Sequence, residues 1–90
     1  MKVRNLNGTS QNDCSCGSWL KHWEKHSHKK ADLCSAYGCM HKATKGGHVQ
    51  KEDPADMHWY IVPLCDSCNN RFGQELSLAP GIEPISAIAD

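Results

Sequence analysis

Four cysteines, arranged as two short pairs, constrain the fold of this 90-residue chain more than any other feature. Four residues separate Cys34 from Cys39, and two separate Cys65 from Cys68. Thiols at such spacings, with a segment between the pairs long enough for a hairpin, are typical of one tetrahedral zinc site. The sequence therefore predicts that these four cysteines bind a single structural Zn²⁺.

The length of the chain makes such a metal useful. Ninety residues form at most one domain, and only 39% of them are apolar. Structural zinc in finger-sized domains contributes roughly 10 kcal/mol or more, so we expect the ion to supply much of the folding free energy. The even count of six cysteines also permits three disulfides, which is the alternative interpretation.

The N-terminal residues contain no apolar stretch of the kind found in secretory signals, and no run approaches membrane-spanning length. We therefore expect a cytoplasmic protein without membrane association, in a reducing compartment where paired thiols bind metals.

Charge is unevenly distributed although the net charge is zero. Residues 21–51 contain seven lysines against two acidic residues, a local balance of +5, and five of the six histidines. This segment is interpreted either as a surface that faces the phosphates of DNA or as a solvated helix face followed by a lysine-rich loop.

The first half of the chain predicts one helix. Residues 1–13 are polar and lack periodicity, which predicts a flexible N-terminal arm. Ser18 is a suitable helix cap, and Trp19, Leu20 and Trp23 form one apolar stripe. We expect this helix to end near Ser27.

The second half predicts a hairpin and a second helix. Residues 43–50 read as a strand broken by two glycines, and residues 58–62 as a β-rich strand. A helix is expected from Asp66 to about Leu76, followed by an irregular tail over residues 77–90.

Each cysteine pair is expected to form a zinc knuckle, the first over Cys34–Cys39 and the second over Cys65–Cys68. The order of knuckle, hairpin, knuckle and helix is that of a treble clef. The second cysteine pair opens the helix, where backbone N–H groups and the helix dipole favour thiolates. The expected fold is α+β: a small zinc-stabilised treble-clef (ββα) domain over residues 14–76, with an added N-terminal helix.

Three motifs in this frame carry a family resemblance. They are Gly47-His48-Val49, Ile61-Val62-Pro63-Leu64-Cys65 and Cys68-Asn69-Asn70-Arg71-Phe72. With them, residues 34–76 resemble the HNH, or His-Me finger, nucleases. The resemblance implies a metal-dependent DNA endonuclease in which His48 is the general base and Asn69 is a ligand of a catalytic Mg²⁺.

Two positions depart from the family pattern. Gly47 stands where the family has an aspartate, and Tyr60 stands at its middle asparagine. The alternative is therefore a catalytically inactive zinc-binding module for nucleic-acid or protein interaction. In that case His48 has a structural hydrogen bond or is a zinc ligand, and Asn69 caps the helix.

Two further cysteines, Cys14 and Cys16, are too close in sequence for a usual zinc knuckle. One interpretation joins them to His22 or His26, which share a helix face, in a second metal site. The other is a packed N-terminal cap in which Trp19 and Trp23 cover the zinc core and the thiols are buried or free.

Overall fold

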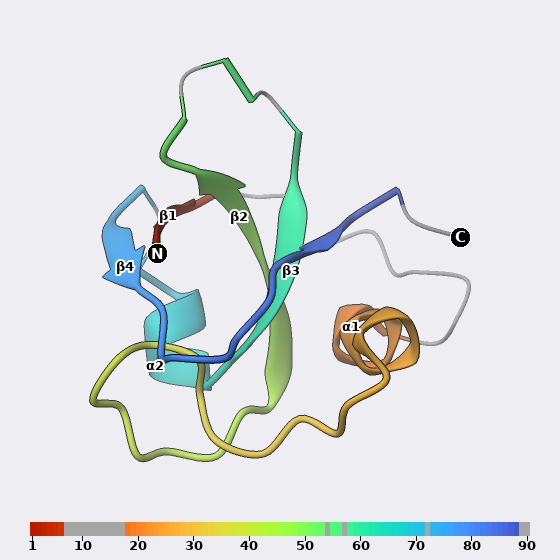
Figure 1. The fold of residues 1–90 in the computed structure, drawn as a ribbon. Helices are drawn as coiled ribbons and strands as arrows, with labels where there is room; N and C mark the ends of the chain where they lie inside the picture. Colours follow the sequence, from red (N-terminus) through yellow and green to blue (C-terminus); the bar gives the residue numbers. More distant parts are fainter. Residues whose placement is uncertain (7–17, 54, 57, 72, 89–90) are drawn as a thin grey trace.

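An antiparallel sheet of five strands forms the centre of the molecule (Figure 1). The computed structural model describes residues 1–6, 18–53, 55–56, 58–71 and 73–88. The strands are β1 (Lys2–Asn5), β2 (Lys45–Lys51), β3 (Tyr60–Leu64), β4 (Glu75–Ser77) and β5 (Ile85–Ser86). Their order across the sheet is β4-β1-β2-β3-β5, and each neighbouring pair is antiparallel. The chain is thus a small α+β domain, as expected.

The hairpin of β2 and β3 lies at the middle of this sheet. Its register pairs Gly46 with Pro63, Gly47 with Val62 and His48 with Ile61. The expectation that the glycines break the first strand is wrong, because β2 continues through both of them. Successive residues of a strand face opposite sides of a sheet, so the register determines which layer each β2 residue meets.

Helix α1 (Trp19–Ser27) confirms the helix expected to begin after Ser18. The Ser18 hydroxyl accepts a hydrogen bond from the backbone N–H of Lys21, at 3.1 Å. At the other end, His28 adopts a left-handed conformation with φ 60°, and its N–H donates to the carbonyl of Glu24. Both ends of the helix are therefore capped by local sequence.

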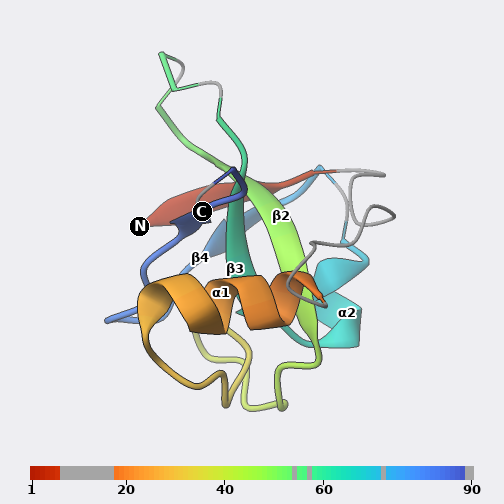
Figure 2. The same cartoon turned by 90° about the vertical axis from the view of Figure 1, so that its right-hand side faces the viewer.

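The two helices lie on opposite faces of the sheet, as Figures 1 and 2 together show. Helix α1 packs on β2, β3 and β5, and the short helix α2 (Asp66–Asn69) packs on the other face of β2 and β3. The cysteines share the α2 face with an aliphatic core. The buried members of that core are Val3, Ala36, Val49, Val62, Leu64, Leu76 and Leu78. The predicted cap of tryptophans over the zinc core is therefore wrong, because α1 lies on the other face of the sheet. Trp23 of this helix is buried and donates its indole N–H to the Glu83 carbonyl.

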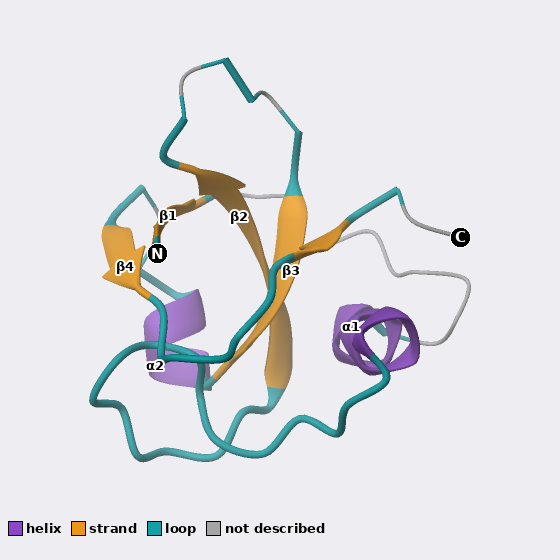
Figure 3. Cartoon of the chain, viewed as in Figure 1, coloured by secondary structure: helices purple, strands orange, loops and turns teal. Residues whose placement is uncertain are grey.

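The chain after α2 differs most from expectation (Figure 3). The helix expected to reach Leu76 ends at Asn69, and β4 follows. Gly73 turns the chain with φ 77°, and its N–H donates to the carbonyl of Asn5, at 2.7 Å. This segment therefore pairs with β1 as a strand, and the helix does not continue beyond its first turn.

The two ends of the chain also contribute strands. The arm expected over residues 1–13 is wrong for Lys2–Asn5, which form β1, and the tail expected to be irregular contains β5. Both additions pair directly with the hairpin strands. Within the described residues, no helix has the length and apolarity needed to cross a bilayer.

Candidate metal centre

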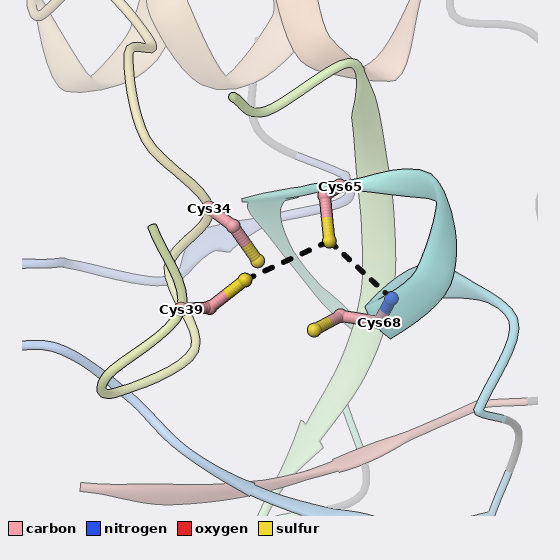
Figure 4. Close-up of side chains that lie close together, drawn as sticks. All are labelled: Cys34, Cys39, Cys65 and Cys68. Carbon is pink, nitrogen blue, oxygen red and sulfur yellow. Dashed lines mark hydrogen bonds between the residues drawn. The ribbon is translucent and has the colours of Figure 1, made fainter. Parts of the chain in front are cut away.

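The four cysteines of the two knuckles meet at one point beneath the sheet (Figure 4). The sulfur atoms of Cys34, Cys39, Cys65 and Cys68 all lie within 4.8 Å of one another. The Sγ atoms of Cys39 and Cys65 are 3.8 Å apart. A tetrahedral ion with Zn–S bonds of about 2.3 Å requires S···S separations of about 3.8 Å. The cluster therefore has the size and donor set of a tetrathiolate metal site.

Backbone hydrogen bonds shape the first knuckle. The N–H of Cys34 donates to the carbonyl of His41 at 2.8 Å, and the N–H of Cys39 donates to that of Ala36 at 3.0 Å. Gly38 has φ 79°, which side-chain-bearing residues rarely adopt. The resulting tight turn brings the two thiols of this pair to the same side.

The second knuckle is the beginning of α2. Cys65 is the N-cap, and its sulfur accepts the backbone N–H of Cys68 at 3.5 Å. The N–H of Asn69 donates to the carbonyl of Cys65, closing the single helical turn. Because an N-cap and the residue three positions later lie on one side of the first turn, the spacing of two residues converges both thiols on the cluster.

The surroundings of Cys34, Cys65 and Cys68 shift the pKa values of their thiols in different directions. Burial raises the pKa of Cys34. Burial also raises the pKa of Cys68, and hydrogen bonds to the Cys65 and Cys34 thiols raise it further. Burial acts in the same direction on Cys65, but hydrogen bonds from the Cys68 backbone and the neighbouring thiols outweigh it and lower the Cys65 pKa. This pattern favours a first thiolate at Cys65, and a cation bound in the cluster would displace the remaining protons.

Asn5 holds α2 in place from β1. Its side-chain amide, which is 1% exposed, donates to the carbonyl of Cys68 at 2.9 Å and to that of Asn69 at 3.1 Å. Sequence analysis missed this residue because residues 1–13 were interpreted as a flexible arm. The alternation of exposed Lys2 and Arg4 with buried Val3 and Asn5 is the strand signal that could have revealed it.

His48 faces α1 and is 3% exposed. The Trp19 ring lies edge-on to the imidazole, with centroids 4.6 Å apart, and the Trp59 ring lies at 6.1 Å. Among the described residues, its buried Nδ1 has no hydrogen-bond partner. Burial, with a smaller electrostatic effect of His22, lowers the pKa of His48. A neutral imidazole beneath a tryptophan is poorly placed to deprotonate a water molecule, which a general base must contact.

His48 and Asn69, the two expected catalytic residues, are separated by the sheet. A Cβ atom placed on Gly47 would lie 3.0 Å from Asn69 Oδ1, so Asn69 packs against the α2 face of β2. His48 is the next residue of that strand and faces α1. The same Cβ would lie 2.4 Å from a methyl group of Leu64, so the aspartate found in the HNH family would require the Leu64 side chain to move.

Tyr60 has partners of its own at the far end of the hairpin. Its hydroxyl donates to Asp56 at 2.6 Å, and the ammonium of Lys51 lies over its ring at 4.4 Å. The Tyr60 hydrogen bond, with further ones from His58, lowers the pKa of Asp56 to about 2. Tyr60 therefore takes part in a surface cluster in the β2–β3 loop, and these contacts do not include His48.

The remaining cysteines, Cys14 and Cys16, lie outside the described residues. His22 and His26, their expected partners, have ring centroids 4.6 Å apart on α1, and the His22 Nε2 is 2.9 Å from the carbonyl of Ser86.

Comparisons with known proteins do not extend the HNH resemblance. No family model matches this chain, and neither the curated proteins nor the solved structures contain a match. The observations that bear on function are therefore those of the site itself. Within the described part of the chain, the four-cysteine cluster is the group of side chains with the geometry of a metal site.

Proposed function

We propose that this chain is a zinc-binding module in which Cys34, Cys39, Cys65 and Cys68 hold one Zn²⁺ with a structural role. The observation that carries the proposal is the convergence of four sulfur atoms within 4.8 Å. Four thiolates complete the tetrahedral shell of zinc and leave no open position for a substrate or a reactive water. The ion would join the first knuckle to α2 and so hold the α2 face of the sheet together.

We further propose nucleic acid as the partner of this module. The support is the acid-free run over residues 33–51, which contains three lysines and lies within the lysine-rich segment 21–51. Lys42 and Lys45, which flank the first knuckle and the start of β2, are exposed. Exposed lysines can neutralise phosphates and release their counterions. Metal-binding thiols are kept reduced in a compartment such as the cytoplasm, which we propose for this module.

The second candidate is a DNA endonuclease of HNH type, with His48 as general base and Mg²⁺ bound by Asn69. The proximity of Asn69 Oδ1 to position 47 favours it, because the HNH resemblance implies a metal between these two positions. The burial of His48 under Trp19 opposes it. An amide oxygen alone also binds Mg²⁺ poorly. We therefore favour the binding module.

Metal content tests the first proposal. The purified protein in reducing buffer is compared by native and denaturing mass spectrometry, and Zn²⁺ is then exchanged for Co²⁺. One zinc per chain, lost on denaturation, and the visible absorption of a tetrahedral Co²⁺–thiolate complex are expected. The substitution Cys68→Ser should lower the affinity for the metal and change the Co²⁺ absorption spectrum. A protein that folds without metal, or that contains three disulfides, would contradict the proposal.

Activity separates the two candidates. The zinc-loaded protein is incubated with supercoiled plasmid and Mg²⁺, beside the conservative variant His48→Gln. Because His48 is packed against the α1 layer, its replacement by alanine would disturb the fold as well as any catalysis. We expect no cleavage by either protein. Cleavage by the wild type that His48→Gln abolishes, with zinc content and thermal stability unchanged, would establish the endonuclease instead.

A further inference from the structure

The first zinc knuckle presents two large side chains to solvent. Tyr37 is 71% exposed and Met40 is 76% exposed, although each is within two residues of Cys39. The backbone beneath them is fixed, because the N–H of Tyr37 donates to the Ser77 carbonyl at 2.7 Å and Ala36 forms a β-bridge with Leu78. An aromatic ring and a thioether are thus held on a rigid turn without being buried.

These side chains border a hollow of about 690 Å³ between the knuckle and β4. Arg71, just beyond α2, contributes to the opposite wall, together with Glu75 of β4. Cys39 and Cys68 of the metal cluster also line it. The metal proposed above would therefore fix the separation of the two walls.

The hollow has a cationic side chain beside its exposed aromatic ring. Arg71 and His41 lie in its lining, and Lys42 follows His41 directly. Glu75 is the acidic residue of the lining and offsets the charge of Arg71, while the knuckle side of the lining contains no acidic residue. Cations beside an exposed aromatic ring are the combination that binds single-stranded nucleic acid, because the ring stacks on a base while the cations neutralise phosphates.

We propose that the hollow between the first knuckle and β4 binds single-stranded nucleic acid, with Tyr37 stacking on a base and Arg71 contacting a phosphate. This inference rests on the proposed zinc module, whose ion holds the two walls, and it names the form of nucleic acid that the module binds. Met40 adds apolar contact beside the stacked base. A duplex keeps its bases stacked on one another, so Tyr37 has no base face to contact there.

The test measures the affinity of the zinc-loaded protein for labelled oligonucleotides by fluorescence anisotropy. The probes are a twelve-residue oligo-dT, a twelve-residue oligo-rU and a duplex of the same length. We expect both single strands to bind more tightly than the duplex. Tyr37→Ala should weaken single-strand binding by roughly five- to one-hundred-fold, whereas Tyr37→Phe keeps the ring and should stay within about two-fold of the wild type.

Two further variants identify the contacts. Arg71→Gln should lower the slope of log affinity against log salt by about one phosphate, near 0.7 for a single strand. Trp59→Ala is the matched control, since Trp59 is an exposed aromatic residue near His48 on the α1 face, and its loss should leave the affinity unchanged. Zinc content is measured for every variant, so that a failure of metal binding is distinguished from a failure of this inference.

Three results would overturn the inference. One is a zinc-loaded protein that does not bind the single strands at low salt, which would leave the knuckle as a surface for a protein partner. The second is equal or tighter binding to the duplex. The third is an affinity that Tyr37→Ala does not change while its zinc content stays at that of the wild type.

Discussion

Replacing Gly46 by alanine tests how closely α1 lies on the sheet. A Cβ atom at this position would lie 2.3 Å from the carbonyl carbon of Trp19 and 2.5 Å from the backbone nitrogen of Leu20. Ordinary contacts between carbon atoms are about 3.5 Å or more, so the helix would have to move by about 1 Å. Backbone atoms of a capped helix cannot rotate away as the end of a side chain can.

The size of the effect follows from this contact. Overpacking a filled interface costs about 1–3 kcal/mol when side chains yield, and a contact with backbone belongs at or above the upper end. Loss of glycine flexibility in the unfolded chain offsets only about 0.4–1 kcal/mol. A net loss of about 2–3 kcal/mol lowers the unfolding temperature of a domain of this size by roughly 8–24 °C.

Gly38→Ala is the matched control for this change. A Cβ atom on Gly38 would meet nothing within 4 Å, but the residue has φ 79°. Its substitution should therefore cost about 1 kcal/mol through backbone strain alone. Thermal unfolding is followed by circular dichroism at fixed free zinc in reducing buffer. If Gly46→Ala unfolds no earlier than Gly38→Ala, the close approach of α1 to β2 is refuted.

Three further expectations concern the metal site and the histidine. Chelation of zinc should abolish the cooperative thermal transition, since the roughly 10 kcal/mol supplied by structural zinc is comparable with the whole stability of a small domain; a transition unchanged by chelator would contradict a structural ion. Asn5→Ala should cost about 1–3 kcal/mol and weaken zinc affinity in a competition titration, because it leaves the carbonyls of Cys68 and Asn69 without their amide donor; an unchanged affinity would show that Asn5 does not position α2. The pKa of His48 is lowered in the folded protein, so as the pH drops below about 6.5 the unfolded chain binds a proton before the folded one and the free energy of unfolding should fall. Urea unfolding at pH 7.5 and 5.5 should show a smaller fall in this free energy for His48→Gln than for the wild type. Equal falls would refute the assignment of the pH dependence to His48.

The parts of the fold that could be predicted are those with a local signal. The spacings within the cysteine pairs predicted the cluster, because a knuckle places both of its thiols through its own backbone. Ser18 predicted the start of α1, because a hydroxyl cap acts within one turn. Neither prediction required knowledge of the distant chain.

The parts that could not be predicted depend on pairing over long distances. Asn5 contacts residues 63 and 64 positions away, and its backbone also pairs with the segment around Gly73. The sequence predicted a helix from Asp66 to about Leu76, yet β1 takes Glu75–Ser77 as a strand partner. Tertiary pairing overrides a short periodic pattern, as it commonly does in small sheets. The position of Phe72 itself lies outside the described residues.

The two glycines of β2 allow close packing on both faces of this strand. Gly46 lets α1 approach one face of the strand, and Gly47 lets Leu64 and Asn69 approach the other. Because the residues alternate between faces, a Cβ at Gly46 would meet the backbone of α1, and a Cβ at Gly47 would meet the side chains of Leu64 and Asn69. The carboxylate of the HNH family would occupy the space that Leu64 and Asn69 fill at position 47. The close packing of the α2 layer therefore explains why a glycine stands at position 47, and a carboxylate at this position would require the Leu64 and Asn69 side chains to move.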